Sequence, residues 1–287
     1  MKQKQLGIIY IITSAFFFAL MSFFVRLSGD LPVIQKSFFR NLVAFFVALF
    51  ILLKEKQPFK IGRGNMKYMI IRAAAGTFGI LCNFYAVDHL NLADASILNK
   101  LSPFFAVIFS VFLLKENVKP VEWLTLAVAF IGALFVIKPS FTMEFIYAIS
   151  GTLGGISAGL AYACVRKLGT RGVNGSVIVI FFSGFSCLVT LPQILLNYAP
   201  MTSKQLICLL LAGCAAAGGQ LAITAAYTKA PAREISVFDY SQIIFTATLG
   251  LLFLDQIPDP LSILGYIIII GAAVFKWRYN MKPAEQT

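Results

Sequence analysis

Two charged residues stand inside long apolar stretches of the sequence and carry its clearest chemical signal. Lys100 and Asp239 lie 139 positions apart, and each has several polar neighbours within four residues. Ionisable side chains inside membrane-spanning segments are costly and usually functional. Lys100 could attract a carboxylate or another anionic group, and Asp239 could take a cationic group or a proton. Alternatively, each could pair with a side chain or a backbone carbonyl of another helix, and the sequence leaves both interpretations open.

Two further apolar stretches carry small and polar residues at helical spacing. Arg72, Gly76 and Asn83 fall on one face of the first stretch, and Gln220 and Tyr227 on one face of the second. Such a face either packs closely against a neighbouring helix or lines a cavity. We therefore expect a polar cavity between helices. The candidate substrate-binding residues are Asn83, Tyr85, Asn99, Lys100, Tyr162, Gln220, Tyr227, Asp239 and Tyr240.

Three residues within the apolar stretches of the chain are assigned to gating or structure: Arg40, Arg72 and Pro103. Arg72 is close enough to one end of its stretch for its side chain to reach the membrane surface. Arg40 lies deeper, and its simplest role is a buried structural contact. Pro103 has no N–H and therefore frees a carbonyl in mid-stretch, which protein or water must satisfy.

The sequence offers little for catalysis, metal ions or cofactors. Its five Cys stand singly in apolar runs, and its one His is His89. A structural zinc site needs paired ligands, and ATP-driven pumping within the chain needs a G-x-x-x-x-G-K-[ST] loop that does not occur. A membrane enzyme would need His, Asp or Glu clustered near one membrane face. We expect no catalytic residues, no bound metal and no cofactor.

The elements that position these residues are predicted to be membrane-spanning helices. Of 287 residues, 59% are hydrophobic and 13% charged, and the mean hydropathy is +0.84. A soluble domain has about a quarter charged residues, and a helix that crosses the bilayer needs about 20 apolar residues. The composition therefore indicates an all-α integral membrane protein. Ten stretches qualify as spans: 6–27, 33–53, 67–88, 92–114, 121–137, 145–165, 173–196, 205–228, 233–254 and 260–277.

The basic residues predict how these spans are oriented. If the N-terminus is cytoplasmic, 17 of the 24 Lys and Arg fall in cytoplasmic segments, three on the other side and four within spans. Lys and Arg accumulate in the cytoplasmic loops of membrane proteins. We therefore expect a multi-pass protein of the cytoplasmic membrane with both termini in the cytoplasm. The net charge of +12 then reflects topology rather than binding to nucleic acid.

The two halves of the sequence match each other. A shift of 139 residues aligns Ala86 with Ala225 and Glu116 with Asp255, and a shift of 140 aligns Arg26 with Arg166. Each half contains five spans, an odd number, so the second half enters the membrane from the opposite side. Inverted repeats of this kind are typical of secondary transporters, whose substrate site lies near the midplane between the halves. We expect one membrane domain, with repeat one at about 1–140 and repeat two at about 141–287.

The motifs of both halves resemble the drug/metabolite transporter superfamily, EamA type. The resemblance extends from the first span to the last. It rests on Phe38-Phe39-Arg40, Phe84-Tyr85-Ala86, Lys115-Glu116, Lys138-Pro139, Val165-Arg166-Lys167, Gly219-Gln220 and Ala230-Pro231-Ala232. It implies a ten-helix carrier whose central cavity is lined by spans one, three, four, six, eight and nine, with spans five and ten at the periphery. The resemblance does not imply a substrate.

These observations favour a secondary transporter that moves a small organic metabolite by alternating access. The candidate residues suit an amino acid or an amino-acid-like zwitterion, with S-adenosylmethionine as one example. The partners we expect are this small molecule, the lipid bilayer and, through Asp239, a proton as a candidate coupling ion. The alternative is a flippase or exporter of an amphipathic or lipid-linked compound or drug, and a membrane-embedded enzyme ranks below both. The sequence is compatible with a monomer or a homodimer.

Overall fold

The structure, a computed structural model, describes residues 2–114, 120–137, 143–229 and 236–281. Every regular element in these ranges is a helix. In chain order they are α1 (Lys2–Leu27), α2 (Val33–Lys54), α3 (Met66–His89), α4 (Leu92–Asn99), α5 (Ser102–Leu114), α6 (Pro120–Ile137), α7 (Met143–Thr170), α8 (Gly175–Leu196), α9 (Ser203–Lys229), the 3-10 helix η1 (Ser236–Tyr240), α11 (Ser241–Leu254) and α12 (Pro260–Met281).

The predicted spans are present as helical segments. Eight segments of the described residues are long and apolar enough to cross a membrane, and two shorter apolar helices, Trp123–Val136 and Phe238–Leu254, correspond to predicted spans five and nine. Large apolar side chains such as Phe50, Leu53 and Phe112 are exposed on the outside of the bundle. A bilayer would cover such side chains, as the composition predicts. The fold is therefore an all-α membrane bundle.

The fourth and ninth spans are broken at equivalent positions. The sequence predicts single segments over 92–114 and 233–254, but the structure divides the first at Lys100-Leu101 and begins the second with a 3-10 turn that ends at Tyr240. Pro103 explains the first break because proline has no N–H and fits the first turn of a helix. Each break therefore places a charged residue, Lys100 or Asp239, at or beside a helix end.

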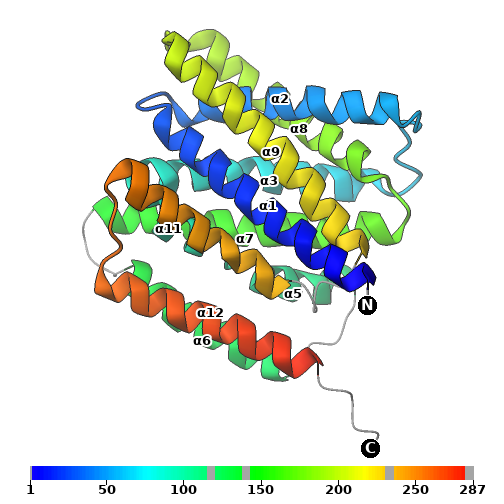
Figure 1. Ribbon diagram of the computed structural model, residues 1–287. Helices are drawn as coiled ribbons and strands as arrows, with labels where there is room; N and C mark the ends of the chain where they lie inside the picture. The colour runs from blue at the N-terminus through cyan, green and yellow to red at the C-terminus, as the bar shows by residue number, and fades with distance from the viewer. Residues whose placement is uncertain (1, 115–119, 138–142, 230–235, 282–287) are drawn as a thin grey trace, which may run out of the picture.

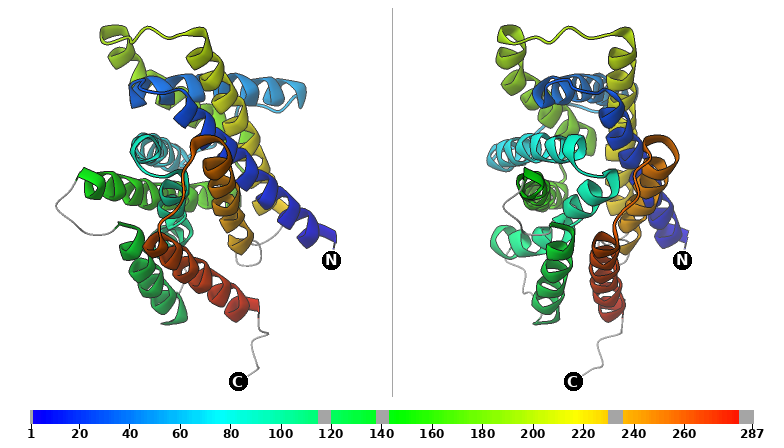
Figure 2. Two further views of the ribbon diagram at one scale, coloured as in Figure 1. Left: turned by 60° about the vertical axis from the view of Figure 1, so that its left-hand side comes forward. Right: turned by 90° about the vertical axis from the view of Figure 1, so that its left-hand side faces the viewer.

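The packing of the helices follows the internal repeat. The shift of about 139 residues relates α1 to α7, α2 to α8, α3 to α9, α4–α5 to η1–α11, and α6 to α12. The extensive α1–α9 contact has its counterpart in α3–α7, and α1–α11 has its counterpart in α5–α7. The α2–α8 and α6–α12 contacts each join a helix to its own equivalent in the other half. In Figures 1 and 2, α2 and α8 lie at one end of the bundle and the α6–α12 pair at the other.

Glycines allow the inner helices to approach closely. A Cβ on Gly155 would lie 2.6 Å from the carbonyl oxygen of Leu98, and a Cβ on Gly159 would lie 2.5 Å from the Cβ of Phe105. These glycines therefore hold α7 against the broken span α4–α5, as small residues do in membrane bundles. The Lys100 break is fixed against α7 in this way.

Candidate functional site

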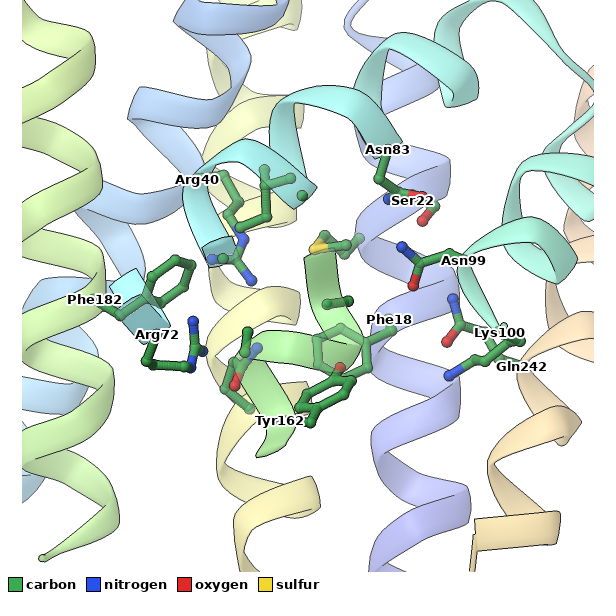
Figure 3. Close-up of a pocket in the computed structure, with 17 residues that line it drawn as sticks. Phe18, Ser22, Arg40, Arg72, Asn83, Asn99, Lys100, Tyr162, Phe182 and Gln242 are labelled. Carbon is green, nitrogen blue, oxygen red and sulfur yellow. The ribbon is translucent and has the colours of Figure 1, made fainter. Parts of the chain in front are cut away.

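A polar cavity lies between the helices of the two halves. Its volume is about 80 Å³, which is enough for several water molecules. Figure 3 shows its lining, to which α1, α2, α3, α4, α7, α8, α9 and α11 contribute. The lining residues are Phe18, Met21, Ser22, Arg40, Arg72, Gly76, Gly79, Ile80, Asn83, Asn99, Lys100, Ala158, Ala161, Tyr162, Phe182, Gln220 and Gln242.

The structure brings five of the candidate binding residues to this cavity: Asn83, Asn99, Lys100, Tyr162 and Gln220. It also brings Arg40 and Arg72, which the sequence assigned to gating or structure. Spans five and ten, observed as α6 and α12, contribute none of the lining residues, as the family resemblance implies. Spans two and seven do contribute, through Arg40 and Phe182, although the resemblance does not place them at the cavity.

Lys100 and Asp239 form a buried ion pair. Lys100 Nζ lies 2.6 Å from Asp239 Oδ2, and both side chains are almost fully buried. Lys100 is part of the cavity wall, whereas Asp239 lies behind it. The second carboxylate oxygen of Asp239, Oδ1, is buried without a hydrogen-bond partner. The two residues that the repeat aligns therefore meet between the halves, so in this state the ammonium of Lys100 already has a carboxylate partner.

The break at Lys100 leaves a carbonyl that the other half satisfies. In a continuous helix the Phe104 N–H would bond to the Lys100 carbonyl, but here it bonds to Leu101. The hydroxyl of Tyr240 donates to the freed Lys100 carbonyl oxygen at 3.0 Å. Pro103 follows this junction and is half-buried. Tyr240 thus tethers one broken span to the other, while its own ring is buried outside the cavity wall.

Arg40 and Arg72 are buried cations on the opposite side of the cavity from Lys100 (Figure 3). Their exposed fractions are 2% and 4%. Both guanidinium groups face the ring of Phe182, with Arg72 Cζ at 4.1 Å and Arg40 Cζ at 5.9 Å from its centroid. Arg40 Nη1 donates to Asn41 Oδ1 at 2.5 Å. The Nε atoms of both arginines are buried without a hydrogen-bond partner.

The side chain of Arg72 does not reach the nearer membrane surface, so that expectation is wrong. The physical reason is Gly76, one turn deeper on α3: a Cβ there would overlap Arg72 Nη1 and would lie 2.8 Å from the Phe182 ring. Without that Cβ, the guanidinium lies over Gly76 and against Phe182. Gly76 and Phe182 together form a slot that keeps Arg72 at the cavity.

Besides Asp239 and Tyr240, two further candidate residues do not contribute a described side chain to the cavity. Tyr85 lies on α3 but packs against other aromatic rings, 4.6 Å from the centroid of His89 and 5.5 Å from that of Tyr147. The side chain of Tyr227 lies outside the described residues, although its backbone belongs to α9.

Sequence reasoning missed several cavity residues. Phe18 and Ser22 continue a face of α1 that begins at Ser14, whose hydroxyl donates to the Gly219 carbonyl at 2.9 Å. The spacing of four residues was the available signal. Sequence reasoning also missed a second, partly buried ion pair, Lys36 with Asp88 at 2.6 Å. No three His, Cys, Asp or Glu side chains in the part of the chain that the structure describes come together as metal ligands.

The sequence model of the EamA-like transporter family matches the chain twice, over residues 5–138 and 145–277. The two matches correspond to the two sets of helices that pack around the cavity. The chain belongs to the EamA-like transporter family. Its membership in the drug/metabolite transporter superfamily confirms the resemblance seen in the sequence motifs.

Relatives of this EamA-like protein carry transporter names. It is 32% identical over 272 residues to the pseudopaline exporter CntI of Pseudomonas aeruginosa, covering 93% of this chain and 94% of that one. It is 24% identical to the S-adenosylmethionine uptake transporter of Rickettsia prowazekii, covering 84% and 81%. A solved crystal structure superposes with a TM-score of 0.71 at 16% identity over 96% of this chain and 99% of the other, which supports the fold.

Proposed function

We propose that this EamA-like membrane transporter is a secondary carrier that moves a small organic metabolite across the cytoplasmic membrane by alternating access. The observation that carries the proposal is a polar, charged cavity walled by helices from both halves of the chain, at equivalent places in the two halves. Secondary transporters place their substrate at such a repeat interface, often beside broken helices. The breaks at Lys100 and Asp239 have this form.

The proposed topology has repeat one at about 1–140, repeat two at about 141–287 and both termini in the cytoplasm. The distribution of Lys and Arg supports this orientation because 17 of 24 then face the cytoplasm. The two family matches support repeats of this extent. Alternating access would then exchange the roles of the halves around the cavity.

The proposed substrate class is an amino acid or an amino-acid-like zwitterion. Amide and hydroxyl groups of Asn83, Asn99, Gln220 and Tyr162 offer neutral hydrogen-bonding partners, while the arginines and Lys100 offer positive charge. The names of the two relatives, a pseudopaline exporter and an S-adenosylmethionine uptake transporter, make their named substrates the first compounds to test. A proton on Asp239 is the proposed coupling ion, since one oxygen of that carboxylate has no partner.

Counterflow in proteoliposomes tests the proposal. Liposomes that contain the purified protein are preloaded with one unlabelled compound at a time, and a trace of the same labelled compound is added outside. We expect saturable accumulation of at least one amino-acid-like compound, and no accumulation in liposomes without protein. A folded protein that accumulates none of a panel of amino acids, S-adenosylmethionine and pseudopaline would contradict the proposed substrate class.

Asn99 offers a first site variant with a matched control. Asn99→Ala shortens a cavity-lining amide, whereas Asn197→Ala changes the same residue type at the exposed end of α8. We expect the first to weaken transport and the second to leave it unchanged. Equal transport in both variants would remove Asn99 from the site.

A further inference from the structure

Among the residues that the structure describes, Arg40 and Arg72 have no carboxylate partner. The described ion pairs are Lys36 with Asp88 and Lys100 with Asp239, and among the described residues no acidic side chain lies within ion-pair distance of either arginine. Arg26, a third arginine near the cavity helices, is held by the backbone carbonyls of Val87 and Asp88. The two cavity arginines therefore differ from the other buried cations in charge compensation.

Two uncompensated guanidinium groups in one place are expensive. A buried charge is costly unless it is paired and hydrogen-bonded, and here the two positive charges are close enough to repel each other. The ring of Phe182 offsets part of this cost through cation–π contact. It supplies no hydrogen-bond acceptor for the unpartnered Nε atoms. The arrangement therefore lacks an anion.

The missing anion has a place to bind, because both arginines line the cavity (Figure 3). Guanidinium is planar and matches the two oxygens of a carboxylate or phosphate group, with stronger hydrogen bonds than a neutral donor makes. Gly76 and Phe182 hold Arg72 in position for such a contact. Lys100 is already neutralised by Asp239, so it does not compete as the anion site in this state.

We infer that Arg40, Arg72 and the slot formed by Gly76 and Phe182 are a subsite for an anionic oxygen group of the transported solute. The subsite selects compounds with a carboxylate or phosphate group over neutral analogues. This inference rests on the proposed transport function and moves the anion-binding role from Lys100 to the two arginines. The repeat does not duplicate the subsite, because the shift of 139 places Val179 and Leu211 at the equivalent positions.

Thermal unfolding of the purified protein in detergent, at constant ionic strength, tests the subsite without requiring transport. The probes are succinate and inorganic phosphate, with succinamide as the neutral match for succinate. We expect succinate, phosphate or both to raise the unfolding temperature saturably, and succinamide to leave it unchanged. The response to each probe separates a carboxylate site from a phosphate site. Equal effects of succinate and succinamide, or no effect of either anion, would mean that water alone fills the subsite, and would overturn the inference.

Variants show whether the arginines hold the anion. Arg40→Gln and Arg72→Gln keep hydrogen-bonding capacity and remove charge. We expect the dissociation constant of the protecting anion to rise on the order of 10- to 100-fold for each, as the loss of charge-assisted hydrogen bonds predicts. Arg72→Lys keeps the charge and should recover only part of the affinity, because Lys lacks the planar fork. An unchanged dissociation constant in folded Arg40→Gln and Arg72→Gln proteins would overturn the assignment.

Gly76→Ala tests the position of Arg72 rather than its charge. We expect a weaker anion affinity, because the added Cβ displaces the guanidinium. Gly169→Ala on α7 is the matched control, since nothing lies within 4 Å of its added Cβ. Anion protection that persists while counterflow fails for every solute of the panel would leave the subsite intact and contradict the proposed transport of this substrate class. Counterflow that persists in Arg40→Gln/Arg72→Gln, without anion protection in the wild type, would support transport and overturn the arginine subsite.

Discussion

The cavity is lined by two kinds of buried cation. One kind is paired within the protein, and the other is free to bind a solute. Lys100 has a carboxylate partner at 2.6 Å, contributed by the equivalent position of the other repeat. Arg40 and Arg72 are buried to the same degree, yet they face an aromatic ring and the cavity rather than an acid. The first arrangement is complete within the protein. The second is completed only by something that enters the cavity.

The comparison also distinguishes what the internal repeat supplies from what one half supplies alone. The Lys100–Asp239 pair and the Tyr240 bond to the Lys100 carbonyl both connect the two broken spans across the repeat interface. The arginines belong to α2 and α3 of the first half, and α8 of the second half contributes the Phe182 ring. Equivalent helices of the two halves thus form the walls of the cavity, while the two arginines, which have no equivalent in the second half, give it positive charge.

Lys100→Ala provides the largest test of this difference. The substitution leaves the Asp239 carboxylate buried and unpaired, and we expect the protein to lose about 3–5 kcal/mol of stability. The double variant Lys100→Ala/Asp239→Asn removes both charges and should recover much of that loss. Unfolding in detergent, monitored by circular dichroism, measures both. If Arg72→Gln destabilised the protein as strongly as Lys100→Ala, the distinction between paired and unpaired cations would fail.

Tyr240→Phe gives the next effect in size. It removes the donor to the Lys100 carbonyl and leaves that buried acceptor unsatisfied, at a cost of about 1–3 kcal/mol. The same unfolding measurement applies, and Tyr85→Phe is the control because the contacts of Tyr85 with His89 and Tyr147 are made by its ring, which the substitution keeps. We expect the affinity for succinate or phosphate to stay unchanged in Tyr240→Phe. A lost affinity would mean that the broken-span junction and the arginine subsite are not independent.

Much of the fold was predictable because the hydrocarbon thickness sets the length of an apolar helix. The ten stretches follow from this length rule. Pro103 indicated a freed carbonyl in the fourth stretch, but the sequence predicted that stretch as one segment and did not predict the break at Lys100-Leu101. The importance of Lys100 and Asp239 was also predictable, from charge inside apolar spans and from their common offset. Their contact was not, because the offset relates two residues by symmetry without giving the distance between them.

The arginine subsite escaped the sequence for a different physical reason. Arg72 stands near the start of α3, where a long cationic side chain ordinarily reaches the membrane surface. Its actual direction depends on Gly76 in the same helix and on Phe182 in α8, more than a hundred residues away. Phe182 itself is an apolar residue among many in α8, and nothing in its type indicates a contact with an arginine. Only the packing of α3 against α8 brings Arg72, Gly76 and Phe182 together.

Phe182→Leu is the smallest of these tests and the most selective. A cation–π contact with a buried guanidinium is worth about 2 kcal/mol. The ring stabilises the arginines with and without the anion, so only part of this energy affects anion binding, and we expect the anion dissociation constant to rise by about two- to fivefold. Because Phe182 is buried, the variant also lowers the unfolding temperature, and the dissociation constant is therefore the quantity to compare. Phe50→Leu on the exposed face of α2 is the control. A lower anion dissociation constant in Phe182→Leu would mean that the ring competes with the anion for the guanidinium groups instead of positioning them.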